Sequence, residues 1–112
     1  MNIKKEVLST LKGLSCPVYY ATNHDSEDDT YVIFYILNEK SNEFLDNEEA
    51  SIKYKIHVQI ISNTDYDDIS DDIMAKMKAN NFRRLYSAEN FDSETNFYSK
   101  SIQFEYIHYT YL

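Results

Sequence analysis

Apolar residues in the first segment of the chain recur at spacings of four and three, as on one face of an α-helix. The residues with this spacing are Ile3, Val7, Leu11 and Leu14. They predict a helix over residues 2–13, and Gly13 and Pro17 are typical of residues that end one. We expect a short strand next, over residues 17–22, and then a polar, acidic loop over residues 23–30.

Two strands are predicted in the middle of the chain, with a polar stretch between them. Residues 31–39 (YVIFYILNE) are β-branched and aromatic, which is typical of a central strand covered on both sides, or on one side by a partner. Residues 40–50 are polar except for Phe44 and Leu45. These two are expected at the tip of a hairpin loop, either docking a partner or folded back on their own sheet. Residues 52–60 alternate apolar and polar side chains, as a half-buried strand does.

A helical period returns after residues 62–65 (SNTD), where Ile69, Ile73 and Met77 line one face of a second helix. Its charged residues follow the order that the helix dipole favours, acids first and bases last: Asp67, Asp68, Asp71 and Asp72, then Lys76 and Lys78. Thr64 or Asp65 is expected to cap the first amides. The acidic run therefore needs no catalytic explanation.

The last third of the chain reads as two more strands. Residues 80–82 (NNF) are a stop signal for the helix, since Asn tolerates the left-handed conformation. A strand over residues 82–88, a loop over residues 89–95 and a long closing strand over residues 96–112 follow.

This order of elements favours an α+β fold, a two-layer sandwich in a single domain over residues 1–112. Both helices would cover one face of a mainly antiparallel sheet of four to five strands. The expected core is Val7, Leu11, Val32, Phe34, Ile56, Val58, Ile69, Ile73, Met77, Ile102 and Phe104.

The composition of the chain excludes some classes of function but says little more about the fold. The net charge of −8 opposes attraction to nucleic-acid phosphate and to anionic lipid, so we expect neither sequence-specific nucleic-acid binding nor membrane binding. Eleven Tyr and six Phe suit strands, and Tyr also suits surfaces that alternate between water and a partner. A lone Cys16, no signal-peptide core and no membrane-length apolar run predict a soluble protein of a reducing compartment.

Residue types needed for catalysis are sparse or badly spaced. The single glycine, Gly13, excludes Gly-rich phosphate loops, and the histidines show no metal-ligand spacing, although His57 and His108 could be neighbours across the sheet. The acidic stretches at residues 23–29 and 65–72 lack the central glycine and closing glutamate of a calcium loop. We therefore expect a protein that is not an enzyme and that uses no cofactor or metal.

The order of segments resembles the small tail-completion proteins of tailed phages and prophages, the tail terminator or head-to-tail joining proteins. The segments that carry the resemblance are CPVYYAT, YVIFYILNE, VQIISNTDYDD running into its helix, NNFRRLY and FYSKSIQFEY. The resemblance covers roughly residues 3–106. It implies a structural subunit of the virion tail, assembled in the host cytoplasm, that forms a ring of six copies between the tail tube protein and the head connector.

For a ring of this kind, two sets of residues are candidates. Packing against a neighbouring copy is expected for Tyr86, Phe97, Tyr109 and Tyr111, and docking to the tail tube or the adjoining ring for Phe44 and Leu45. Acids that keep passing DNA from adhering to the lumen are expected either at Asp25, Glu27, Asp28 and Asp29 or at Glu48 and Glu49. An alternative function remains open: an acidic inhibitor of the immunity or anti-restriction type that covers a basic enzyme.

Overall fold

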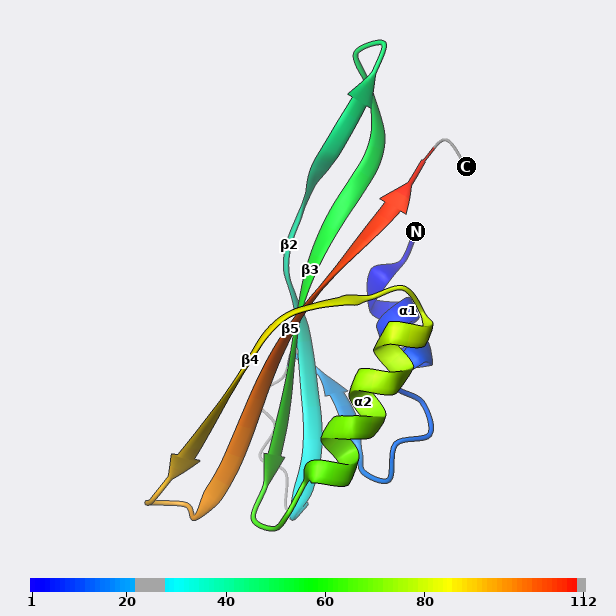
Figure 1. Ribbon diagram of the computed structural model, residues 1–112. Helices are drawn as coiled ribbons and strands as arrows, with labels where there is room; N and C mark the ends of the chain where they lie inside the picture. The colour runs from blue at the N-terminus through cyan, green and yellow to red at the C-terminus, as the bar shows by residue number, and fades with distance from the viewer. Residues whose placement is uncertain (22–27, 111–112) are drawn as a thin grey trace.

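The computed structural model describes residues 1–21 and 28–110. Its elements, in chain order, are α1 (Ile3–Thr10), β1 (Val18–Tyr20), β2 (Thr30–Leu45), β3 (Glu48–Ser62), α2 (Asp67–Ala79), β4 (Arg83–Asp92) and β5 (Phe97–Tyr109) (Figure 1). The order of helices and strands is the one that the apolar spacing predicts.

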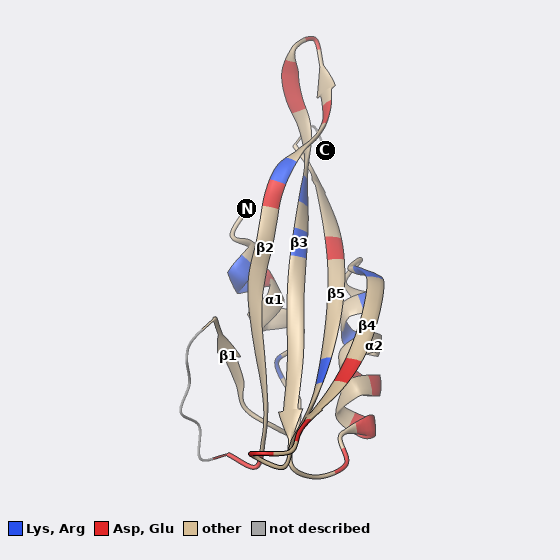
Figure 2. Cartoon of the chain, turned by 90° about the vertical axis from the view of Figure 1, so that its left-hand side faces the viewer, with Lys and Arg blue, Asp and Glu red and all other residues tan. Residues whose placement is uncertain are grey.

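The strands form one five-stranded sheet in the order β1-β2-β3-β5-β4. β1 runs parallel to β2, and the other three neighbouring pairs are antiparallel, so the sheet is mixed. Both helices lie against the same face of the sheet, and the other face carries no helix (Figures 1 and 2). The predicted α+β class with a mainly antiparallel sheet is confirmed, with the parallel β1 as an addition.

A side chain accepts a backbone N–H at the start of each helix. Asn2 Oδ1 accepts the backbone N–H of Lys5 at 3.1 Å and caps α1. At α2, Asp65 Oδ1 accepts the backbone N–H of Asp67 at 3.0 Å, as expected for Asp65, while the N-cap residue Tyr66 makes no side-chain cap bond. Each bond satisfies an amide that has no partner within the helix.

The end of α2 turns the chain directly into β4. Asn81 has φ 69°, in the left-handed region. The backbone N–H of Asn81 donates to Lys78 O at 3.1 Å and that of Phe82 to Met77 O at 3.0 Å, which is the bond pair of a Schellman motif. Phe82 is buried beside Met77, so the apolar contact that accompanies this motif is also present.

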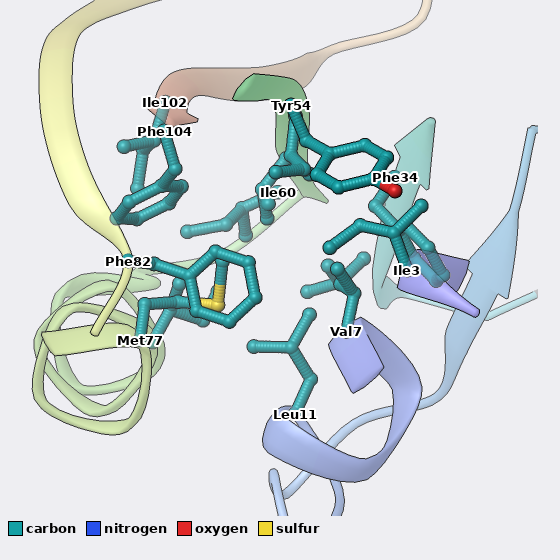
Figure 3. Packing of buried hydrophobic residues seen from close by; sticks show 14 of the residues in the cluster. Ile3, Val7, Leu11, Phe34, Tyr54, Ile60, Met77, Phe82, Ile102 and Phe104 are labelled. Atoms are coloured by element: carbon teal, nitrogen blue, oxygen red, sulfur yellow. The ribbon is translucent and has the colours of Figure 1, made fainter. Parts of the chain in front are cut away.

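The core lies between the helices and the covered face of the sheet. Figure 3 shows Val7 and Leu11 of α1, Met77 of α2 and the ring of Phe82 converging on the strand residues. Of the expected core residues all are fully buried except Ile69, which packs against the cluster but stays partly exposed. Members of the cluster outside the expected core list are Ile3, Tyr54, Ile60, Tyr66 and Phe82.

The expected loop over residues 40–50 is wrong. β2 and β3 continue through most of it as a two-stranded hairpin whose last pair is Leu45 with Glu48. Asp46 and Asn47 join the strands with φ 52° and 65°, the two positive angles of a type I′ turn. The sequence did not predict this part of the strands, because a two-stranded ribbon exposed to solvent on both faces shows no alternation of apolar and polar residues. The hairpin extends beyond β5, and the molecule measures 54 × 24 × 22 Å (Figure 1).

A second expected loop is also shorter than predicted. β4 continues to Asp92, so only the end of the stretch 89–95 forms the turn into β5. There, Asp92 Oδ1 accepts the backbone N–H of Glu94 at 2.9 Å, and Asn96 has φ 60°. An Asx turn and a left-handed Asn therefore close this hairpin in four residues.

Candidate interaction surfaces

The end of the β2–β3 hairpin carries two exposed apolar side chains. Phe44 is 63% and Leu45 55% exposed, and neither folds back on the sheet. Beside them on the turn and the first residues of β3 are exposed acids, Asp46, Glu48 and Glu49. We call residues 44–49 the hairpin tip. The sequence predicted an apolar pair at the hairpin tip, and the exposure of both side chains excludes the alternative in which they fold back on their own sheet. Docking of a partner by this pair stays a prediction.

The acids expected at a lumen do not form one group. Asp25 and Glu27 lie outside the described residues. The Tyr19 hydroxyl donates to Asp28 Oδ2 at 2.8 Å and Asn63 Nδ2 donates to Asp29 Oδ1 at 3.2 Å, just before β2 begins. Glu48 and Glu49, at the start of β3, lie beside the opposite end of β2, about 50 Å away for a 16-residue strand.

The aromatic candidates are spread along the sheet. Tyr86 is 50% exposed on the edge strand β4, Phe97 is partly buried at the start of β5, and Tyr109 is exposed at its end. Tyr111 lies outside the described residues. The structure therefore does not bring these residues into one patch with the hairpin tip.

Two apolar surface features were not predicted. Phe91 and Tyr98 pair across β4 and β5 with ring centroids 4.6 Å apart, and both are exposed. Their cross-strand neighbourhood depends on the register, which one sequence segment alone does not specify. The second feature is a hollow between α2 and the start of β4.

We call this hollow, of about 600 Å³, the α2–β4 pocket. Its apolar lining includes Met74, Phe82 and Phe104, and its basic rim is formed by Lys78, Arg83 and Arg84. The Schellman turn creates it, because the turn reverses the chain from α2 into β4 beside Phe104 of β5. The only sequence signal was NNFRR, in which a helix stop precedes both arginines of the chain.

The basic rim is partly unpaired. Arg83 forms an ion pair with the buried Glu105 carboxylate, and Lys53 Nζ lies 4.0 Å from the same side chain. Among the residues that the structure describes, the side chains of Lys78 and Arg84 form no ion pair. Lys78 and Arg84 therefore place uncompensated positive charge at this rim, in a chain of net charge −8.

The face of the sheet without helices is half-exposed. Tyr31, Ile33 and Tyr35 of β2 are partly buried, while Val32 and Phe34, which point to the helices, are fully buried. Among the described residues, no helix covers this face of β2, and its side chains are less buried than those that face the helices (Figure 2).

Titratable groups do not assemble into a catalytic set within the described part of the chain. His57 pairs with Gln103 and His108 with Ile52, so the two histidines are not cross-strand neighbours as was considered. Burial lowers the pKa of His57, whose ring stacks on Tyr35. Burial, together with the nearby Asp28 charge, raises the pKa of the Cys16 thiol and so disfavours the reactive thiolate.

The same described residues contain neither a metal-binding cluster nor a membrane-spanning helix. No group of three or more His, Cys, Asp or Glu side chains that could hold a metal ion occurs among residues 1–21 and 28–110. Neither α1 nor α2, the helices in that described part, has the length and apolar character needed to span a bilayer.

Comparison with known proteins gives a likeness in fold. No family model matches the sequence, and a search of curated proteins finds no match. Among solved structures, a chain of a particle described as the virion of a native gene transfer agent is similar, with a TM-score of 0.51 and 10% sequence identity. The match covers 88% of this chain and 81% of that chain, so the likeness extends over nearly the whole fold.

Proposed function

We propose that this chain is a structural protein of a phage-like virion, and that it completes the tail as a ring between the tail tube and the head connector. The observation that carries the proposal is the fold shared, over most of both chains, with a chain of the gene transfer agent virion. The segment order, which resembles that of tail-completion proteins, supports the same function from the amino-acid sequence alone.

The surfaces of the chain suit a subunit that acts by assembly. A closed ring needs two different patches on each copy, each complementary to the other. The chain offers a protruding apolar hairpin tip and, elsewhere, a half-covered sheet face and the α2–β4 pocket. Side chains that lie exposed in the single chain would then be buried between copies.

The negative charge suits a channel through which DNA passes without adhering. Asp29 precedes β2, and Glu48, at the start of β3, lies beside the far end of β2, so acids at both positions would line such a channel as two separate bands.

The direct test is to locate the chain in particles. Cells that encode it would be induced to release particles, with a short peptide tag at the exposed Met1 of the chain. We expect the tag to co-sediment with particles on a density gradient, and gold-labelled antibody to mark one position, the junction of head and tail. Cells with the untagged chain are the control. Particles that lack the chain would refute the virion role, and label along the tail or on the capsid would refute the junction.

One observation favours the second candidate, an acidic inhibitor of a basic enzyme. Asp67, Asp68 and Asp71 at the start of α2 are exposed and form no ion pair with any described residue. Such a cluster fits the basic surface of a nuclease. Capture of one basic enzyme by the monomer, with loss of binding after Asp68→Lys and Asp71→Lys, would establish this function in place of the ring.

A further inference from the structure

The hairpin tip and the α2–β4 pocket are complementary in two respects. The tip presents the apolar pair Phe44 and Leu45, and the pocket has an apolar lining that includes Met74 and Phe82. The acids that flank the tip correspond to the bases that rim the pocket. A volume of about 600 Å³ falls in the range of about 300–1,000 Å³ that is typical of binding pockets.

The charges on the two surfaces lack partners within the chain. Among the described residues, Asp46 and Glu48 form no ion pair, and neither do Lys78 and Arg84. Opposite charges that are unpaired on two surfaces of one chain attract copies of that chain to each other, and they select one orientation of contact.

The tip cannot reach the pocket of its own chain. Strand pairing continues to Leu45 and Glu48, and the ribbon points along the long axis of the molecule, away from α2 (Figure 1). The pocket lies beside the C-terminal end of α2, near the middle of that axis. Folding the tip back would break the β2–β3 hydrogen bonds, so a tip that enters this pocket comes from another molecule.

We propose that the hairpin tip of one copy inserts Phe44 and Leu45 into the α2–β4 pocket of a second copy of this chain. The inference deepens the proposed function, on which it rests, because it names the two patches of a head-to-tail contact. Each copy offers one tip and one pocket, so the contact repeats from copy to copy and a closing rotation produces a ring.

The contact is weak by itself. An aromatic side chain buries about 150–250 Å², and a stable interface needs about 1,200–2,000 Å². We therefore expect free chains to be mainly monomeric, with the contact strengthened when several copies assemble together. A test has to capture a transient pair rather than rely on a stable oligomer.

Disulfide trapping captures such a pair. Cys16 is the only cysteine, so Cys16→Ser provides a background without thiols. Leu45→Cys places a thiol on the tip and Ala75→Cys one on the exposed α2 wall of the pocket, in two chains of different tag length. We expect a mixed disulfide dimer when these two chains are combined under mild oxidation. The control replaces Leu45→Cys by Glu94→Cys, an exposed turn position at the far end of the sheet.

Charge reversal tests the orientation. The tip change Glu48→Lys with Glu49→Lys should lower the trapping yield at least about tenfold, and Lys78→Glu with Arg84→Glu in the partner should restore it. Arg83 is left unchanged because it pairs with the buried Glu105. Asp71→Lys with Glu94→Lys makes the same change in net charge away from the tip and should leave the yield unaltered.

The outcomes separate the contact from the function. Three results would each overturn the contact. The first is equal trapping with the Glu94→Cys control, and the second is no trapping although circular dichroism shows the chains to be folded. The third is charge reversals that leave the trapping yield unchanged. Trapping of the tip cysteine in particles on a different protein would overturn the contact as well. Particle localisation can succeed while trapping fails, or the reverse, so failure of this inference is distinct from failure of the virion role.

Discussion

Truncation of two isoleucines on α2 tests how the fold is stabilised. Ile73 is fully buried against the sheet, whereas Ile69, one turn earlier on the same helix, remains partly exposed. Ile73→Ala and Ile69→Ala remove the same atoms from the same helix. The gain in helix propensity is the same at both sites, up to about 0.7 kcal/mol, and cancels in the comparison.

The expected difference follows from burial. Ile73→Ala removes side-chain atoms that have no contact with water and leaves a cavity beside the sheet, at a cost of about 3 kcal/mol. Ile69→Ala leaves a site that solvent can partly fill, so we expect about 1 kcal/mol. Unfolding entropy of about 2.1 cal/mol/K per residue gives about 4 °C per kcal/mol for this chain, so the expected shifts in melting temperature are about 12 °C and about 4 °C.

Thermal unfolding followed by circular dichroism, with urea titration at one temperature, measures both variants. If the two substitutions lower the free energy of unfolding equally, or if Ile69→Ala lowers it more, the packing of α2 described above is refuted. Ile73→Asp extends the series. It buries a carboxylate at the same position and should abolish folding, since the total stability of such a domain is about 5–15 kcal/mol. Ile73→Asp with an unchanged melting curve would be equally decisive against this packing.

Two further predictions concern the ends of α2. Asn81→Ala should lower the free energy of unfolding, measured in urea, by about 1–2 kcal/mol, because Ala disfavours φ 69°. Asn81→Gly should leave this free energy unchanged, and equal effects of the two substitutions would contradict the Schellman turn. Burial and the 2.7 Å hydrogen bond to Glu89 raise the pKa of Tyr66 to about 12. Because the folded pKa is the higher one, the stability linked to this phenol is complete below about pH 10 and lost as the pH rises through 12. Tyr66→Phe should remove this loss of stability at alkaline pH. If the stability of both proteins depends on pH in the same way between about pH 10 and 12, Tyr66 is not its cause.

The periodic parts of the structure could be predicted because burial on one face leaves a local record. Val7 and Leu11 on α1, and Ile73 and Met77 on α2, recur at helical spacing because one side of each helix contacts the sheet. Ile56 and Val58 alternate with polar residues because one face of β3 is covered. Phe44 and Leu45 were recognised by a different signal, as two apolar residues in a polar stretch.

The extension of the hairpin could not be predicted from apolar spacing. Residues 40–43 are polar on both faces and pair with residues of β3 that lie close in space only after the turn forms. Asp46 and Asn47 carried the one usable signal, because both tolerate the positive φ of a type I′ turn.

By itself the sequence determined the order of helices and strands, the class of fold, most of the core and the negative charge. These depend on neighbours within a turn or a strand, so one chain segment specifies them. Only the tertiary structure decided the strand order with its parallel β1, the separation of Asp29 from Glu48, and the α2–β4 pocket. Each of these joins residues from different elements, such as Met74 of α2 and Phe104 of β5, and their proximity arises from packing that no single segment encodes.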